Sequence, residues 1–202
     1  QTNDAGNYYF DMTYGTMAKG NTTIDGVPCS FDQTTGIGAD CQWIEIDGVK
    51  YWYEGGKRQG LEGRGKEIYD PASDAWYWLD SNADGKMAVS KDVYQDSNGG
   101  KWVRYDANGH MIKGWDTNDD GTYYFDLITG AMAKGDIVVD NLPCSFDTVT
   151  GIALNCAWKR INGKDYWYEG GKRQGYDPNN AAYRGKEIYD PASNGWYWLD
   201  NV

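Results

Sequence analysis

The sequence contains few leucines or isoleucines and a single histidine, His110, and these shortages exclude several kinds of protein. Leucine-rich amphipathic helices cannot be built from this composition, because such a helix needs apolar side chains along one whole face. No apolar run approaches the roughly 18 residues that a membrane-spanning helix requires. Zinc ligands usually come as closely spaced cysteine or histidine pairs, and the chain has no such pair.

Basic side chains are also in the minority, since the chain has 19 Lys and Arg residues but 30 Asp and Glu residues. The formal net charge of −11 disfavours nucleic acid, because binding to a phosphate backbone needs a basic patch. It disfavours anionic membrane surfaces for the same reason. Neutral glycans or cationic head groups are compatible partners, and the acidic balance also keeps an aromatic surface soluble.

Glycine and aromatic residues are abundant: the chain has 27 Gly and 15% aromatic residues, with a mean hydropathy of −0.75. Tryptophan and tyrosine favour strands, glycine favours tight turns, and the chain is too aromatic to be disordered. The composition therefore predicts an all-β protein of short strands. No signal-peptide-like segment opens the sequence, so we expect a mature fragment or an excised piece.

The sequence is duplicated. The decapeptide YWYEGGKRQG fills Tyr51–Gly60 and returns at Tyr166–Gly175, and RGKEIYDPAS fills Arg64–Ser73 and returns at Arg184–Ser193. The offset grows from 115 to 120 positions because five extra residues lie within Tyr176–Tyr183, which we interpret as a loop that tolerates insertion. Catalytic centres are seldom duplicated, whereas surfaces that hold a repetitive polymer often are. The duplication therefore favours a binding module over an enzyme.

A shorter unit repeats inside each copy. It reads NYYFD at Asn7–Asp11 and WYWLD at Trp76–Asp80, each followed by a turn rich in Asp, Asn and Gly, and recurs mostly every 20 to 26 residues. A strand, a turn and a strand make a β-hairpin, and a fixed period of this length indicates a solenoid. We therefore expect an elongated solenoid of stacked β-hairpins with two tandem super-repeats, residues 1–116 and a second, incomplete one over 117–202 that is continuous with the first.

Alternation along each strand assigns the two faces of the unit. Its second and fourth positions never carry a charge, so we expect them to form the core between hairpins. Its first and third positions mix aromatic and charged residues, so we expect a partly solvated face that meets ligand. This predicts that Trp78 and Trp198 are exposed while Tyr77 and Tyr197 are buried.

Four cysteines occur as two identical spacings, Cys29 with Cys41 and Cys144 with Cys156. One disulfide in each copy respects the duplication, and a loop this short is worth roughly 2–3 kcal/mol in the chain-entropy description. Disulfides imply an oxidising, extracytoplasmic compartment, so we expect a secreted protein.

Two segments carry a family resemblance. GKWVRYDANGHMIKGW (Gly100–Trp115) and GTYYFDLITGAMAKG (Gly121–Gly135) resemble the cell-wall-binding repeats of choline-binding and glucan-binding proteins. The resemblance implies a β-hairpin solenoid without catalytic activity that anchors a surface protein or enzyme to wall polymers or glucans. The cysteine-bearing segments resemble a variant found in long surface proteins of Gram-positive gut bacteria.

The resemblance also implies a ligand site. In choline-binding members the ligand lies between consecutive hairpins, enclosed by two tryptophans and a third aromatic residue with a methionine nearby. The matching positions are Trp102, Trp115, Tyr124 and Met132. A quaternary ammonium over aromatic faces gains about 0.5–2 kcal/mol per ring. Gly114-Trp115 fills the family's Gly-Trp slot, which elsewhere reads Ser90-Lys91, Gly20-Asn21 and Gly135-Asp136, so we expect one choline site at most.

Sugar rings instead stack on aromatic side chains, while carboxylates and amides bind their hydroxyl groups. The alternative is that tryptophan and tyrosine merely pack between hairpins. The Trp76/Trp78 and Trp196/Trp198 pairs lie near polar residues, namely Asp80, Asp200, Arg104 and Lys50. The predicted ligand-binding residues are Trp52, Trp76, Trp78, Trp102, Arg104, Trp115, Tyr124, Met132, Trp167, Trp196 and Trp198.

Two weaker signals concern carboxylates. Two turns copy the first half of an EF-hand loop but have Lys91 or Leu127 where the calcium-binding glutamate belongs, and Asx-rich turns give the same letters. The weak calcium candidates are Asp80, Asn82, Asp84, Asp116, Asn118 and Asp120.

The carboxylates in GKEIYDP, at Glu67/Asp70 and Glu187/Asp190, could indicate a glycosidase, but their duplication favours a structural role.

The sequence thus predicts a non-catalytic module that binds a cell-wall or extracellular, glucan-like glycan and tethers a secreted surface protein. It is expected to need no cofactor. One alternative is choline or teichoic-acid binding, and another is a passive stalk or adhesin repeat that contacts a host protein.

Overall fold

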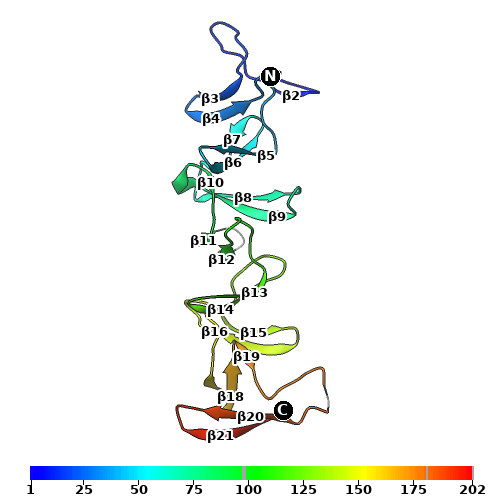
Figure 1. Ribbon diagram of the computed structural model, residues 1–202, viewed down its shortest axis with the longest axis vertical. Coiled ribbons are helices and arrows are strands. Elements are labelled where there is room, and N and C mark those ends of the chain that lie inside the picture. Colours follow the sequence, from blue (N-terminus) through cyan, green and yellow to red (C-terminus); the bar gives the residue numbers. More distant parts are fainter. Residues whose placement is uncertain (97–98, 181, 202) are drawn as a thin grey trace. The chain divides into compact units, whose positions relative to one another are not determined.

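The computed structural model describes residues 1–96, 99–180 and 182–201, and β-strands make up its regular structure apart from a short 3-10 helix, η1, at Ser81–Ala83 (Figure 1). No α-helix occurs among the described residues, so the all-β prediction is confirmed. Within the same residues, no helix has the length and apolar character needed to cross a membrane.

The strands are short and follow one another along the chain. They are β1 (Thr2–Asn3), β2 (Gly6–Asn7), β3 (Gly20–Ile24), β4 (Val27–Phe31), β5 (Gln42–Ile46), β6 (Val49–Glu54), β7 (Lys57–Arg58), β8 (Gly65–Asp70), β9 (Ala75–Asp80), β10 (Lys86–Met87), β11 (Lys91–Gln95), β12 (Lys101–Tyr105), β13 (Gly114–Asn118), β14 (Gly121–Phe125), β15 (Gly135–Val139), β16 (Leu142–Phe146), β17 (Ala157–Ile161), β18 (Lys164–Glu169), β19 (Lys172–Arg173), β20 (Gly185–Asp190) and β21 (Gly195–Asp200).

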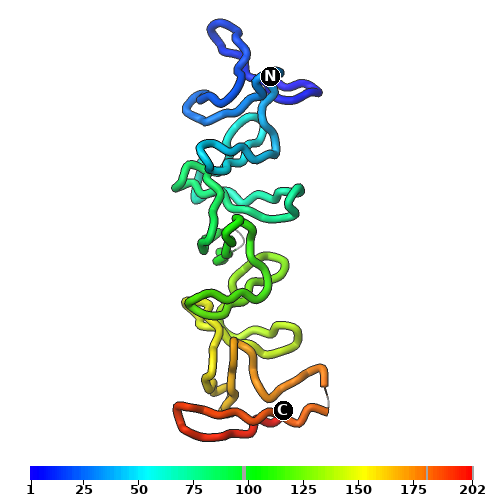
Figure 2. The backbone as a smooth tube through the Cα atoms, in the orientation of Figure 1, coloured from blue at the N-terminus to red at the C-terminus, as the bar shows by residue number. Residues whose placement is uncertain are grey.

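The chain folds into two compact units. Unit 1 comprises Gln1–Gln95 and Arg104–Met111, and unit 2 comprises Asp96–Val103 and Ile112–Val202. In each unit the backbone passes from one hairpin directly to the next (Figure 2). The predicted super-repeat boundary at residues 116 and 117 stays a prediction.

Antiparallel pairing joins the hairpins into sheets. In unit 1 the strand order is β3-β4-β7-β6-β10-β9-β8, with β5 paired to β6, and in unit 2 it is β15-β16-β19-β18-β17. Strands β1–β2, β11–β12, β13–β14 and β20–β21 form two-stranded sheets. The duplicated sequences therefore adopt the same local hairpins, which places equivalent side chains at equivalent positions in both copies.

Turn chemistry explains why these segments form hairpins. Asp25-Gly26 and Asp47-Gly48 both have positive φ at the two central residues, at 49° and 80° and at 52° and 76°. Such a pair matches the right-handed twist of the flanking strands, and Asx-Gly sequences favour it. In the turn after β14, the Asp126 carboxylate accepts N–H groups from Ile128 and Thr129.

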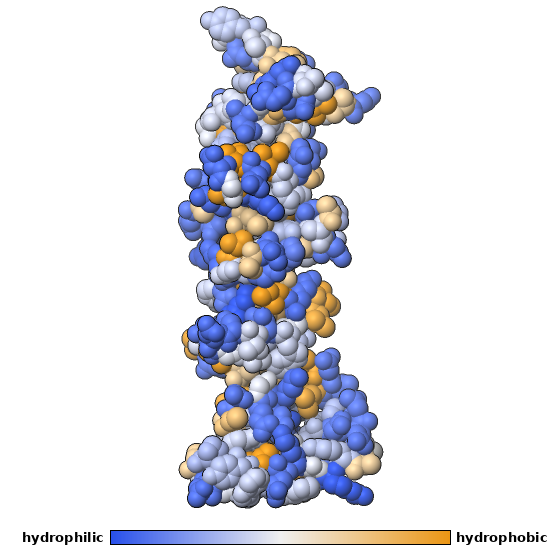
Figure 3. Space-filling model, viewed as in Figure 1, coloured by the Kyte–Doolittle hydropathy of each residue, from blue (hydrophilic) through white to orange (hydrophobic). Residues whose placement is uncertain are grey.

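The predicted core positions are mostly buried. Among second and fourth positions, the buried residues are Cys29, Phe31, Tyr51, Tyr53, Tyr77, Leu79, Val103, Tyr105, Tyr123, Phe125, Cys144, Phe146, Tyr168 and Leu199. Tyr197 departs from the prediction, since it is 39% exposed. Hydrophilic residues dominate the face seen in Figure 3, where hydrophobic residues form small separate patches.

The prediction that third-position tryptophans face solvent is wrong for three of four. Trp52 and Trp167 are each 2% exposed and Trp78 is 7% exposed, whereas Trp198 is 59% exposed. These hairpins are packed on both faces: Trp52, for example, belongs to a core cluster with Tyr77 and Leu79. We infer that pairing contributes to this difference between Trp78 and Trp198, because β10 pairs with β9, whereas β21 pairs with β20 alone.

The disulfide prediction, and with it the paired-cysteine variant, is also wrong: Cys29, Cys41, Cys144 and Cys156 are all free thiols. Cys29 lies in β4 and is buried, with its Sγ 3.4 Å from the carbonyl oxygen of Val27. Cys41 is exposed just before β5, with its Sγ 3.9 Å from Asp40 Oδ1. Because one thiol of each pair faces the core and the other faces solvent, the equal spacing does not bring them together.

Candidate functional site

A row of aromatic rings runs through unit 1. Trp43 of β5 lies opposite Trp52 of β6, with ring centroids 5.1 Å apart. Trp43 also meets Tyr77 at 5.0 Å, and Tyr77 meets His110 at 5.3 Å. Each pair packs edge to face at a contact distance typical of aromatic side chains. We call these four residues the unit 1 aromatic row, and they form one continuous wall.

Hydrogen bonds to Asp70 fix the polar edge of this row. Its Oδ2 accepts a hydrogen bond from Trp43 Nε1 at 3.2 Å and another from Ser73 Oγ at 2.9 Å, and Tyr77 donates to Ser73 at 2.9 Å. Burial acts to raise the pKa of Asp70, but hydrogen bonds from Ala72 N–H, Ser73 and Trp43 outweigh it and hold the pKa below its usual value. The carboxylate is therefore ionised at neutral pH and holds the Trp43 ring in place.

Three members of the row, Trp43, Tyr77 and His110, line a cavity of about 480 Å³. Trp43, Tyr77 and Met87 supply apolar surface, while Lys50 and Asn108 add polar groups. Small-molecule sites typically measure about 300–1,000 Å³ and combine apolar walls with a few polar groups. The cavity can therefore accept a ligand that stacks on a ring and forms hydrogen bonds at its edge.

The second copy repeats the row in a more open form. Trp158 meets both Trp167 and Tyr197 at 5.1 Å, and its Nε1 donates to Asp190 Oδ2 at 3.1 Å. The Ser193 hydroxyl is the main cause that lowers the pKa of Asp190. Tyr197 is 39% exposed, whereas its counterpart in unit 1 is 5% exposed.

Each copy also presents an exposed tyrosine beside an exposed tryptophan. Tyr69 and Trp76 are cross-strand partners in β8 and β9, with ring centroids 5.3 Å apart at 46°, and Tyr189 and Trp196 repeat this in β20 and β21 at 5.3 Å and 47°. The exposed fractions are 42% and 39% in the first pair and 42% and 68% in the second. We call these the exposed Tyr–Trp pairs.

The turn of each hairpin orients its exposed pair. Tyr69 donates to Asp74 Oδ1 at 2.6 Å, and Tyr189 donates to Asn194 Oδ1 at 2.6 Å. Asp74 and Asn194 both have positive φ, at 51° and 52°, as an Asx residue in a tight turn tolerates. The rings therefore keep a fixed orientation although their faces remain open to solvent.

Contacts link the residues of the predicted choline quartet two by two, and a choline site formed by all four stays a prediction. Trp115 and Tyr124 are cross-strand partners with ring centroids 5.2 Å apart. Met132 instead donates its backbone N–H to the carbonyl oxygen of Trp102 at 2.8 Å. Lys172 Nζ lies 4.6 Å from the centre of the Trp115 ring. An ammonium group of the protein itself thus lies over the Trp115 ring.

Other predicted residues have structural partners. Arg104 forms two hydrogen bonds with Asp92, at 2.6 and 3.0 Å, which hold its guanidinium group there. Asp80 accepts a hydrogen bond from Lys91 Nζ at 2.6 Å. Glu67 accepts one from the Gln95 amide at 2.7 Å. These contacts account for the side chains without a ligand.

The calcium candidates lie in hydrogen-bonded turns. Asn118 Oδ1 accepts N–H groups from Asp120 and Gly121, and Asp80 Oδ1 accepts the N–H of Asn82. Within the described ranges, no group of three or more His, Cys, Asp or Glu side chains has the arrangement of a metal site. Calcium binding at these turns stays a prediction.

The sequence reasoning missed Trp43, Trp158, Tyr69 and Tyr189. A signal for the first two was present, because Trp43 precedes Trp52 by nine positions, just as Trp115 precedes Tyr124. The same nine positions separate Trp158 from Trp167. A Gly-Trp dipeptide does not mark these two tryptophans, since Gln42 and Ala157 stand in the place of glycine.

Comparison with known proteins agrees with this hairpin pattern. Residues 95–137 match the family model described as the choline-binding repeat. The chain is 27% identical over 216 residues to Glucosyltransferase-S of Streptococcus mutans and 28% identical over 195 residues to Glucosyltransferase-S of Streptococcus downei. These matches cover 98% and 79% of the chain and 14% of each curated relative. The chain therefore spans a small part of the length of these relatives.

Solved structures are similar at the level of the fold. CbpJ from Streptococcus pneumoniae matches with a TM-score of 0.58 and 21% identity, over 89% of this chain and 59% of that one. Choline binding protein F from Streptococcus pneumoniae, in the presence of a peptidoglycan analogue, matches with a TM-score of 0.55 and 22% identity, over 85% and 53%. These two likenesses show a shared fold, and the match to the choline-binding repeat covers residues 95–137.

Proposed function

We propose that this chain is a non-catalytic module that binds a cell-wall or extracellular, glucan-like glycan and tethers a larger secreted or cell-surface protein to it. The observation that carries this proposal is the exposed Tyr–Trp pair, which recurs in both copies. The similarity to Glucosyltransferase-S and to choline binding protein F supports it.

The exposed pairs have the chemistry of a sugar-stacking surface. Large aromatic side chains are usually well covered in folded proteins, so a tryptophan that leaves 39% or 68% of its surface in solvent is informative. The apolar face of a pyranose ring can lie on such a side chain. Asp74 and Asn194 stand beside the rings and offer groups that hydrogen-bond to sugar hydroxyls.

Duplication of the pair suits a polymeric ligand. Once one pair has engaged a glycan strand, binding of the second becomes intramolecular, and overall affinity can rise by about 10²–10⁴ without new kinds of contact. We infer in addition that successive hairpins stack as a solenoid of two super-repeats, so that further repeats add further pairs.

The acidic residues support binding rather than hydrolysis. A glycosidase needs one carboxyl group with a raised pKa to protonate the leaving oxygen. The pKa of Asp70 and that of Asp190 are instead lowered, and each carboxylate accepts hydrogen bonds from a serine and a tryptophan. Their role is to hold the aromatic rows in position.

Retention on insoluble polymer tests the proposal. The double substitution Trp76→Ala with Trp196→Ala removes both exposed rings and is expected to weaken binding to insoluble α-glucan or isolated cell walls at least tenfold. Ile128→Ala is the matched control, because Ile128 is 84% exposed and lies outside the pairs. Full retention of the double variant, or no retention of the unsubstituted chain on either polymer, would refute the proposal.

Choline is a second candidate ligand, and the cavity beside the unit 1 aromatic row favours it. Trp43, Tyr77 and Met87 line this cavity and match the combination of aromatic residues and methionine in choline-binding members. Two features favour a sugar instead. The rings contact each other and form a wall, and the positive charge of Lys50 would repel the positive charge of choline. Millimolar choline should quench tryptophan fluorescence only if this alternative holds, and Trp43→Phe should then weaken the response.

A further inference from the structure

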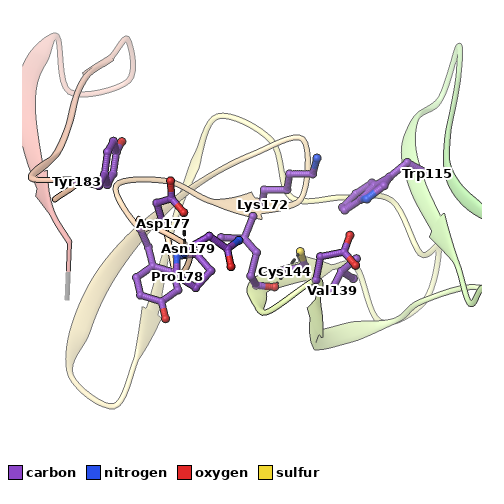
Figure 4. Close-up of a pocket in the computed structure, with 11 residues that line it drawn as sticks. Trp115, Val139, Cys144, Lys172, Asp177, Pro178, Asn179 and Tyr183 are labelled. Carbon is purple, nitrogen blue, oxygen red and sulfur yellow. Dashed lines mark hydrogen bonds between the residues drawn. The ribbon is translucent and has the colours of Figure 1, made fainter. Parts of the chain in front are cut away.

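The five-residue insertion in the second copy supplies one wall of a pocket. This insertion pocket measures about 410 Å³ and lies entirely within unit 2 (Figure 4). Trp115, Val139 and Cys144 line one side of it. The inserted segment, Tyr176–Tyr183, lines the other side with Tyr176, Asp177, Asn179 and Tyr183.

Specific hydrogen bonds hold the inserted segment in place. Asn201 Oδ1 accepts the backbone N–H of Asp177 at 3.2 Å, and Asn201 Nδ2 donates to the carbonyl oxygen of Tyr183 at 2.8 Å. Asp177 Oδ1 accepts the N–H of Asn179 at 2.9 Å. Asn201 thus forms hydrogen bonds with both ends of the segment, which hold this wall of the pocket in place.

The first copy has a cavity of about 460 Å³ at the corresponding place, but the loop beside it is shorter. This loop of the first copy, Leu61–Gly63, has three residues. It is held by a hydrogen bond that the Ser81 hydroxyl donates to the carbonyl oxygen of Gly63 at 2.8 Å. The cavity next to that loop has aliphatic and charged walls, with Leu61 and Glu62 where the second copy has tyrosines. The insertion therefore changes the surface chemistry of an otherwise faithful repeat.

The pocket has an apolar floor and a polar rim. Val139 and Cys144 are 5% and 1% exposed, which makes the floor dry and apolar. Around the rim, Asp140 and Asp177 carry hydrogen-bond acceptors, and Asn179 carries both donors and acceptors. Pockets that bind small molecules combine a largely apolar lining with a few polar groups in this way.

The position of the Lys172 ammonium group bears on which ligand the pocket can bind. Its ammonium lies 4.6 Å from the centre of the Trp115 ring, and it forms no ion pair among the residues that the structure describes. Because this ammonium group lies over Trp115, it would compete there with a quaternary ammonium ligand such as choline. It can instead donate hydrogen bonds to hydroxyl oxygens, which favours a neutral, polyhydroxylated ligand.

We propose that the insertion pocket binds a single neutral hexopyranose unit of the glycan, as a binding site separate from the exposed Tyr–Trp pairs. This inference rests on the proposed function. The apolar face of the sugar packs against the floor and the inserted tyrosines. Its hydroxyl groups donate to Asp140 and Asp177 and accept from Lys172 and Asn179.

A loop exchange tests the pocket directly. Replacing Tyr176–Tyr183 by Leu-Glu-Gly, the loop of the first copy, removes one wall while keeping a connection that this fold already uses. Asn179→Ala is a milder second variant, because Asn179 is exposed and its side chain takes part in no hydrogen bond that holds the segment. Val149→Ala, at a 77% exposed residue outside the pocket, is the control.

Calorimetry with isomaltoheptaose and laminariheptaose, in the background of Trp76→Ala with Trp196→Ala, isolates the pocket from the exposed pairs. We expect residual binding that the loop exchange weakens at least tenfold and that Asn179→Ala weakens about threefold, while far-UV circular dichroism stays unchanged. Undiminished binding after both changes would overturn the pocket and leave the proposed function intact. Failure of the unsubstituted chain to bind any glycan polymer or oligomer would overturn both.

Discussion

Trp78 and Trp198 offer a matched comparison, because they occupy the same place in an identical pentapeptide, WYWLD, yet differ in burial. Trp78 is 7% exposed and Trp198 is 59% exposed. Truncation of a buried tryptophan to alanine costs about 3–5 kcal/mol. Trp78→Ala should therefore lower the free energy of unfolding of unit 1 by about 3–5 kcal/mol, whereas Trp198→Ala, with less than half of its surface to lose, should lower that of unit 2 by about 1–2 kcal/mol.

Urea denaturation followed by far-UV circular dichroism measures both values. With a denaturant slope of about 2 kcal/mol per molar, the expected loss moves the midpoint for Trp78→Ala by roughly 1.5–2.5 M. The midpoint for Trp198→Ala should move by less than about 1 M. Equal shifts for the two variants would refute the inference that pairing of β10 with β9 buries the first tryptophan and leaves the second open.

Two further predictions concern acid and backbone strain. The pKa values of Asp32, Asp70, Asp126, Asp147 and Asp190 are all lowered in the folded state, so their contribution to stability is complete above the ordinary aspartate pKa of about 3.9 and is lost as pH falls below it. Thermal melting from pH 7 to pH 2 should show a steep fall below about pH 4 that Asp70→Asn reduces, and a flat profile would contradict this. Gly65→Ala should destabilise the β8–β9 hairpin well beyond Gly48→Ala, since a Cβ on Gly65 would clash with the carbonyl oxygen of Leu79, whereas one on Gly48 would meet nothing within 4 Å. Equal melting temperatures of these two variants would argue against the tight approach.

Local pattern predicted the hairpins because turn and strand chemistry agree along the chain. Asp47-Gly48 between alternating aromatic strands indicates one hairpin register, and Trp43 lies opposite Trp52 as that register requires. Alternation likewise identified Tyr77 and Leu79 as core residues, since the inner face of a strand carries no charge. These features depend on neighbours in sequence, which a single sequence displays.

Burial of the opposite face depends on neighbours in space. Alternation indicated an open face for Trp52 and Trp78, but packing on both sides covers them, and no pattern within one hairpin reveals this. Trp43 was missed because the family pattern has a glycine before this tryptophan and the chain has Gln42 there, although the nine-residue spacing to Trp52 was present. The cysteine spacing misled for a related reason, since Cys29 and Cys41 face core and solvent, respectively.

The most direct measurement of the central claim compares single and double variants of the exposed Tyr–Trp pairs on two ligands. Binding isotherms on insoluble glucan and on a short glucan oligomer should be recorded for Trp76→Ala, for Trp196→Ala and for both together. If the pairs act jointly on one polymer, each single variant should lose at least tenfold in polymer affinity but much less in oligomer affinity, and the double variant should lose nearly all polymer retention. Polymer affinity that is the same in all three variants as in the unsubstituted chain would contradict the account.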